Sequence, residues 1–140
     1  MSTPHSLAAV SLVERYYAAF NAGDMATFLG LVTPDVVHDV NQGGREVGLD
    51  AFKAFMGRMN ACYRERVADL VVMATPDGTR AAAEFVIHGT YLKADGAGAP
   101  PAHGQVYVLP VGAFFEIREG RVSRITNYYN AGDWMRQVGA

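Results

Sequence analysis

The residues best suited to chemistry lie between Val36 and Arg45, in the run Val-Val-His-Asp-Val-Asn-Gln-Gly-Gly-Arg. A carboxylate, Asp39, closes a short apolar segment, and a carboxylate rarely ends a buried strand unless another group pairs with it or uses it. Two interpretations are open. In the first, Asp39 takes a proton from a carbon beside a carbonyl or activates a water, with a pKa raised by burial. In the second, it caps a turn or pairs with Arg45. Regular alternation sends His38 to the opposite face, where a hydrogen bond within the structure is expected.

Tyr16 is the second candidate, because a phenol at the floor of a pocket donates a hydrogen bond to a substrate oxygen that gains negative charge. The other interpretation is a core tyrosine whose hydroxyl bonds to a backbone carbonyl. Its neighbour Tyr17 is expected in the core.

Polar and apolar residues alternate along the strand expected from Thr79 to about Leu92. Glu84 and His88 share one face and Phe85 and Ile87 the other, but alternation alone does not say which face lines a cavity. Four residues along an extended strand span about 13 Å, too far for Glu84 and His88 to share a metal ion. No metal site is therefore expected.

Asn127 and Tyr129 share a face with Ile125 on the last expected strand. An amide and a phenol there would fix the oxygens of a substrate. The alternative is a satisfied polar network in a half-buried sheet.

The elements that must position these residues are helices in the first part of the chain and mostly strands in the rest. Apolar spacing predicts a helix from Ser6 to Phe20 after a frayed end at residues 1–5, a second short helix capped by Asp24, and a third from Gly48 to about Asn60. A short strand is predicted over about Val36–Val40, four strands over 67–74, 79–92, 105–118 and 121–130, and a short terminal helix after Gly132-Asp133.

Helices followed by antiparallel strands indicate the α+β class. Two of the predicted strands exceed the usual five or six residues, so the sheet must curl. We expect one domain over residues 1–140, a cone of three helices packed on a strongly curved antiparallel sheet.

The strand expected from Gln105 to Arg118 is apolar on both faces. Helices cover only one face of such a sheet, and a large exposed apolar patch is uncommon on a monomer. A homodimer packed through the convex face is therefore predicted. The alanine, glycine and proline loop before this strand, residues 93–104, either gates the mouth of the cone or reaches the partner, and its His103 is expected in solvent.

Composition excludes several classes of protein. The 140 residues carry a net charge of -2 without a basic stripe, so nucleic-acid binding is not expected. No apolar run approaches the length that spans a bilayer, no signal peptide is recognised, and Cys62 is the single cysteine, which together predict a cytoplasmic protein without membrane contact. The chain lacks nucleophile-elbow, phosphate-loop and dinucleotide-binding motifs, so no cofactor is expected.

Four segments carry a resemblance to the ketosteroid isomerase-related branch of the NTF2-like (SnoaL-like) superfamily: Glu14–Asp24, Val36–Gly48, Phe114–Val122 and Ile125–Asp133. The resemblance implies a cone-shaped fold. It also implies that Asp39 occupies the position of the general base, Tyr16 that of the oxyanion-hole tyrosine, and Gly112 that of a second donor, where glycine has no side chain to donate.

The same resemblance implies that four further residues point into the pocket and bind the substrate: Glu84, His88, Asn127 and Tyr129. It suggests an isomerase, cyclase or hydratase that transfers protons on a small, mostly apolar, oxygen-bearing substrate. The alternative is a non-catalytic module that uses the cone to hold a metabolite or the outer sheet to hold a partner.

Overall fold

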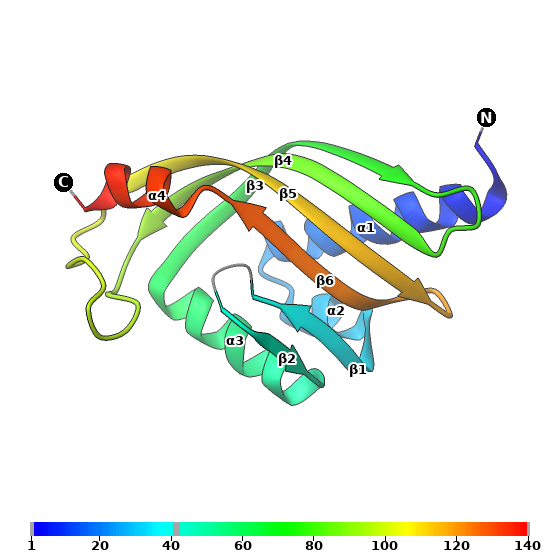
Figure 1. Ribbon diagram of the computed structural model, residues 1–140, viewed down its shortest axis with the longest axis horizontal. Coiled ribbons are helices and arrows are strands. Elements are labelled where there is room, and N and C mark those ends of the chain that lie inside the picture. Colours follow the sequence, from blue (N-terminus) through cyan, green and yellow to red (C-terminus); the bar gives the residue numbers. More distant parts are fainter. Residues whose placement is uncertain (1, 41–42, 140) are drawn as a thin grey trace.

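The computed structural model describes residues 2–40 and 43–139. Part of the turn predicted after Val40 falls on residues 41–42 and lies outside the described residues. Figure 1 shows long strands that bend together along the molecule. The N-terminus lies at the end where the turns of the long strands meet, and the C-terminus lies at the opposite end (Figure 1).

The N-terminal helices form largely where the spacing predicts them. Helix α1 spans Pro4–Ala22 and ends at Gly23, whose φ of 69° suits glycine. It begins earlier than predicted, because Thr3 and Ser6 form a capping box around Pro4 at the first turn, so residues 4–5 are helical rather than frayed. Helix α2 spans Met25–Gly30, and the Asp24 side chain caps it as expected.

Six strands of the described residues form one curved sheet in the order β2-β1-β6-β5-β4-β3. They are β1 (Val32–Asp39), β2 (Arg45–Val47), β3 (Tyr63–Ala74), β4 (Arg80–Tyr91), β5 (Val106–Arg118) and β6 (Arg121–Tyr129). The expectation of a wholly antiparallel sheet is wrong, since β1 pairs in parallel with β6. The chain between them is long enough for the crossover that parallel pairing needs.

Helix α3 (Leu49–Cys62) leads directly into β3, which begins four residues before the predicted Val67. This extension matters because it brings Tyr63 and Glu65 into the sheet. Beyond Ala68 the register shifts, and Asp69 adopts a φ of 56°, as expected of a bulge that bends a long strand.

The inner face of the sheet packs against α1 and α3, and the outer face lies opposite. On β4 the residues Phe85, Ile87 and Tyr91 are buried on the inner face, where the Tyr17 ring of α1 packs against that of Phe85. Burying an apolar side chain of this size contributes roughly 1.5–3 kcal/mol, so this alternation fixes which side of β4 faces the core.

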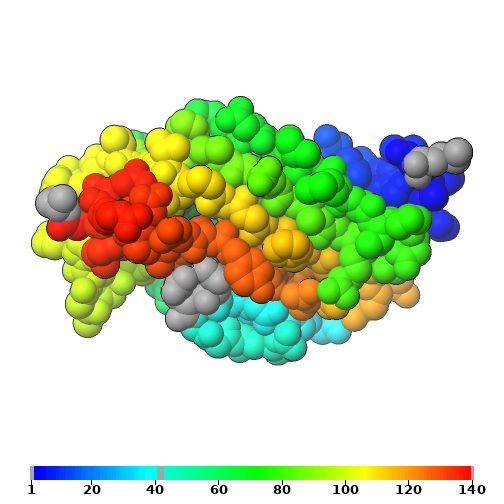
Figure 2. Space-filling model, turned by 45° about the horizontal axis from the view of Figure 1, so that its top comes forward, coloured from blue at the N-terminus to red at the C-terminus, as the bar shows by residue number. Residues whose placement is uncertain are grey.

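A fourth helix, α4 (Ala131–Val138), adds to the three that were predicted to build the cone. Its Gln137 side chain donates to the carbonyl of Val108 at 2.9 Å and accepts from its N–H at 2.8 Å. These bonds satisfy backbone groups of β5 beyond the end of its pairing with β6, and they protect an exposed strand edge. Strand side chains, with α4 at one end, form the outer face (Figure 2).

Candidate functional site

Asp39 does not point into the core. Its carboxylate accepts hydrogen bonds from Arg45 Nε at 2.7 Å, Thr126 Oγ1 at 2.9 Å and Arg124 Nη1 at 3.2 Å. The bond from Arg45, followed by those from Thr126 and Arg124, holds the pKa of Asp39 at about 2. The expectation of an inward carboxylate with a raised pKa is therefore wrong, and the pairing with Arg45, the alternative interpretation, is the one observed.

A line of alternating charges crosses the outer face from Asp39. Arg124 also reaches Glu116 at 3.1 Å, and Glu116 lies 3.4 Å from Arg80. The charges come from five neighbouring strands, so this network ties the outer face together rather than surrounding a substrate.

Tyr16 lies on the inner face, on the opposite side of the sheet from Asp39. Its ring packs 4.3 Å from that of Phe28 and 5.5 Å from that of Phe115, and burial raises its pKa. Its hydroxyl makes no hydrogen bond in the described part of the chain. The predicted pairing of Asp39 with Tyr16 across one pocket is wrong, because a strand turns successive residues to opposite faces and His38 takes the inward position.

His38 is 3% exposed and packs edge-on against Phe52 and Phe55. Its Nδ1 lies 3.3 Å from Glu46 Oε1. The prediction that this histidine lies opposite Asp39 and hydrogen-bonds within the structure is confirmed.

Glu84 and His88 are exposed on the outer face of β4. The expectation that they line the pocket is wrong. Phe85 and Ile87, in the alternate positions, bury more apolar surface and take the inner face.

Asn127 and Tyr129 lie on the inner face with Ile125, as the alternation predicts. Tyr129 is 39% exposed. Burial and then the charges of Glu65 and Asp95 raise the pKa of the Tyr129 phenol, which places that phenol near two carboxyl groups from other elements.

The pair of residues on the inner face best suited to chemistry was not predicted from the sequence. Tyr107 of β5 donates a hydrogen bond to Glu65 Oε2 of β3 at 2.5 Å. Between these strands lies Gly89 of β4, and a Cβ there would stand 2.2 Å from Tyr107 Cζ. The missing side chain thus lets the Tyr107 ring cross β4 and reach Glu65.

Burial raises the pKa of the Glu65 carboxyl, and the hydrogen bond from Tyr107 offsets part of that rise. The surroundings are aromatic: the Trp134 ring lies 6.4 Å from that of Tyr107, 6.1 Å from that of Tyr63 and 5.3 Å from that of Tyr91. A carboxyl with a raised pKa in such a setting is suited to acid–base chemistry.

The 93–104 loop is tied to the same cluster. Tyr63 donates to Asp95 at 2.8 Å, Asp95 lies 3.4 Å from Arg58, and Tyr91 donates to the carbonyl of Pro100 at 2.8 Å. Two carboxyl groups therefore lie beside these aromatic rings. Asp95 lies near the Arg58 cation, whereas Glu65 accepts a hydrogen bond from the neutral Tyr107 phenol. We call Tyr63, Glu65, Tyr91, Asp95, Tyr107, Tyr129 and Trp134 the Glu65 cluster.

One sequence signal for this cluster existed. Tyr63, Glu65 and Val67 alternate in the way a strand requires, but a strand predicted to begin at Val67 leaves Glu65 out.

Comparison with known proteins supports the fold. The chain matches the SnoaL-like domain over residues 13–125. The chain belongs to the SnoaL-like family. A "putative polyketide cyclase" from Pseudomonas putida KT2440 is 61% identical, with 93% of this chain and 97% of that chain covered and a TM-score of 0.90.

A second solved structure, a "putative polyketide cyclase" from Xanthomonas campestris pv. campestris, is 50% identical, with 96% of this chain and 98% of that chain covered and a TM-score of 0.92. An NTF2-like protein of unknown function from Burkholderia pseudomallei K96243 shares 18% identity, a TM-score of 0.77, and coverage of 95% and 98%, which extends the likeness in fold alone. No curated protein matches the chain.

In this SnoaL-like chain Gly112 lies on the outer face, between Glu84 of β4 and Tyr128 of β6. The expected match of Gly112 to an inward donor is therefore wrong. Its inward neighbours, Val111 and Ala113, have no donor side chain either.

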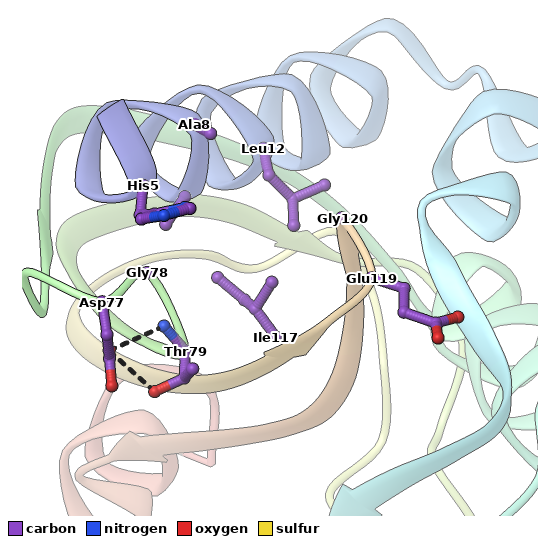
Figure 3. Close-up of a pocket in the computed structure, with 10 residues that line it drawn as sticks. His5, Ala8, Leu12, Asp77, Gly78, Thr79, Ile117, Glu119 and Gly120 are labelled. Carbon is purple, nitrogen blue, oxygen red and sulfur yellow. Dashed lines mark hydrogen bonds between the residues drawn. The ribbon is translucent and has the colours of Figure 1, made fainter. Parts of the chain in front are cut away.

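A cavity of about 220 Å³ lies at the opposite end from the Glu65 cluster, between the first turns of α1 and the β3–β4 and β5–β6 turns (Figure 3). Its two carboxylates are poorly placed for chemistry. Asp77 accepts hydrogen bonds from Thr79 and Thr75, which lower its pKa to about 2, and the Glu119 side chain points away from His5 and Asp77 (Figure 3).

The described residues contain no group of three or more histidine, cysteine, aspartate or glutamate side chains arranged to hold a metal ion. No helix in the same part of the chain is both long and apolar enough to span a bilayer.

Proposed function

We propose that this protein is a small-molecule enzyme in which Glu65 transfers protons to and from the substrate. The observation that carries the proposal is the Glu65 carboxyl itself, placed among aromatic rings with a raised pKa and held by Tyr107 at 2.5 Å. The geometry favours Glu65 over Asp39 as the base, because two arginines hold Asp39 as a weakly basic carboxylate.

The proposed step is the removal of a proton from a carbon beside a carbonyl. The proton moves to a Glu65 carboxylate oxygen, and the electrons of the C–H bond move onto the carbonyl oxygen to give an enolate. Tyr107 holds Glu65 in place, and Asn127 and Tyr129 are the proposed donors to substrate oxygens. Tyr16 keeps a proposed role as a donor further along the inner face.

The substrate is proposed to be aromatic, mostly apolar and carbonyl-bearing. The tyrosine and tryptophan rings of the Glu65 cluster offer flat apolar walls with polar edges. The relatives described as polyketide cyclases support a ring closure, since the enolate carbon formed at Glu65 is the nucleophile that an intramolecular aldol reaction needs.

The test is proton exchange on a simple aromatic ketone. With 2-acetylnaphthalene in D₂O, the methyl protons beside the carbonyl are expected to exchange faster with enzyme than without, as followed by NMR. The rate should rise with pH as Glu65 loses its proton. Glu65→Gln should lower the catalysed rate at least about 100-fold.

Glu84→Gln is the matched control, a strand glutamate on the outer face, and it should keep the wild-type rate. Loss of exchange in Glu84→Gln with normal exchange in Glu65→Gln would move the site to the outer face.

The second candidate is a binding module without turnover. Three hydrogen bonds within the protein favour it, since they fix the rings as a rigid surface and leave those hydroxyls bonded to the protein. They are donated by the hydroxyls of Tyr63, Tyr91 and Tyr107. Saturable binding of 2-acetylnaphthalene with no enzyme-dependent exchange across the pH range would support this candidate over the enzyme.

We also propose that a second copy of the chain packs on the outer face. Large apolar side chains are exposed there, including Val106 at 73%, Tyr128 at 52% and Phe114 at 47%. A hollow of about 510 Å³ beside Met73, Ala82 and Phe114 offers room for side chains of the second copy. An apolar patch of this kind is uncommon on a monomer.

A further inference from the structure

The Tyr17 hydroxyl is a buried polar group that the proposed function leaves unused. Tyr17 is 5% exposed, and its hydroxyl has no hydrogen-bond partner in the described part of the chain. The rings of Phe85, Tyr16 and Phe115 surround it, with centroids 4.7, 5.0 and 6.0 Å from its own. Buried hydroxyls are normally paired, and an unpaired one opposes folding, so this group needs an explanation.

The fold satisfies two of its other buried phenols, those of Tyr91 and Tyr107. Tyr91 is fully buried and donates to the carbonyl of Pro100, and Tyr107, 2% exposed, donates to Glu65. Tyr16, next to Tyr17 on α1, also has a hydroxyl without a partner among the described residues. Two unpaired phenols at adjacent positions thus lie together on the inner face.

The distance between Tyr17 and the Glu65 cluster follows from the residues of β4 that each one contacts. The Tyr17 ring packs on Phe85, whereas the Tyr107 ring that reaches Glu65 lies over Gly89. Four residues of an extended strand span about 13 Å. A molecule that reaches both places is elongated.

We propose that Tyr17 donates a hydrogen bond to an acceptor oxygen at the far end of the substrate, while the carbonyl end lies at Glu65. The substrate class is therefore an elongated aromatic ketone with a second oxygen remote from the carbonyl. This inference rests on the proposed function, because it takes the carbonyl end from Glu65.

The test uses two matched probes, 6-methoxy-2-acetylnaphthalene and 6-ethyl-2-acetylnaphthalene, which differ in the remote oxygen. Wild-type protein should bind the methoxy compound about tenfold more tightly by calorimetry, a difference of about 1.4 kcal/mol. Tyr17→Phe should bind both equally. Glu65→Gln should keep the preference while losing proton exchange, which separates failure of this inference from failure of the proposed function.

Thermal unfolding without a probe supplies the second readout. Tyr17→Phe removes an unpaired hydroxyl and should raise Tm by about 3 °C, whereas Tyr91→Phe, which loses a satisfied bond, should lower it. Equal binding of the two probes by wild-type protein would overturn the inference, as would a Tyr17→Phe variant that keeps the preference. A lower Tm in Tyr17→Phe would also overturn it, because the hydroxyl would then be satisfied within the free protein.

Discussion

Asp39 and Glu65 show how surroundings give two carboxyl groups opposite properties. Asp39 receives hydrogen bonds from two arginines and a threonine, and its pKa falls to about 2. Glu65 lies among aromatic rings and accepts a hydrogen bond from the neutral phenol of Tyr107, and burial raises its pKa. A charged donor favours the carboxylate and burial favours the protonated acid, so the first group stabilises the fold and the second is suited to proton transfer.

The ion pairs that Asp39 forms with Arg45 and Arg124 predict that the stability of the protein falls at acid pH. Because the pKa of Asp39 is lower in the folded protein than its ordinary 3.8, its contribution is complete above about pH 4 and is lost as pH falls toward about 2. Asp39→Asn should lower the free energy of unfolding by about 1 kcal/mol at neutral pH, after allowance for solvent screening. Urea unfolding at a series of pH values measures this, and the two proteins should converge near pH 2.

The control for Asp39 is Asp35→Asn. Asp35 pairs with Arg118, both side chains are more than half exposed, and exposed pairs contribute little, so stability should hardly change. Asp39→Asn should also keep the exchange activity. Its loss in a folded Asp39→Asn protein would contradict the outward assignment of this residue.

At the scale of elements, the Glu65 cluster depends on three strands in register. Glu65 of β3 pairs with Gly89 of β4, and Gly89 pairs with Tyr107 of β5, so one glycine lies under the ring that joins the outer two. The interaction between β3 and β5 exists only because the residue between them has no side chain.

Gly89→Ala should therefore displace Tyr107 from Glu65. The added Cβ would stand 2.2 Å from Tyr107 Cζ, and overpacking of this kind costs about 1–3 kcal/mol. Thermal unfolding should report the loss of stability, and the exchange assay should report a rate lowered at least about tenfold, because Glu65 loses the phenol that holds it. Gly112→Ala on β5 is the matched control, since a Cβ there meets nothing within 4 Å. Equal effects of the two substitutions would show that Gly89 acts through strand propensity alone.

At the scale of the whole molecule, the outer face of the sheet combines exposed apolar side chains with the line of charges that ends at Arg45 and Arg80. Phe114 and Tyr128 contact each other edge-on at 5.7 Å in its middle, and both are about half exposed. A centre of aromatic residues surrounded by polar groups is typical of protein interfaces.

Sedimentation velocity at micromolar concentration should find a dimer for the wild-type protein. Phe114→Glu should convert it to a monomer, because a charge would be buried at the centre of the interface. Leu7→Glu is the control, since Leu7 is 57% exposed on α1, away from this face, and the variant should remain a dimer. A wild-type protein that sediments only as a monomer would contradict the proposed second copy.

The sequence by itself determined the helices, most of the strands and which residues of a strand share one face. Apolar spacing places α1, and the prediction that the strand over 105–118 is apolar on both faces holds for β5, because alternation is a local property of an extended chain. The placement of Asn127 and Tyr129 beside Ile125 follows from the same rule.

Only the tertiary structure decided which of two alternating sets faces inward. Glu84 and His88 lie outside because Phe85 and Ile87 gain more from the core, and Asp39 lies outside because His38 fills the inward place against Phe52 and Phe55. The bond between Glu65 and Tyr107 joins residues 42 positions apart and depends on the register of three strands. Alternation along one strand carries no information about register between strands, and for that physical reason the candidate site emerged only once the sheet was assembled.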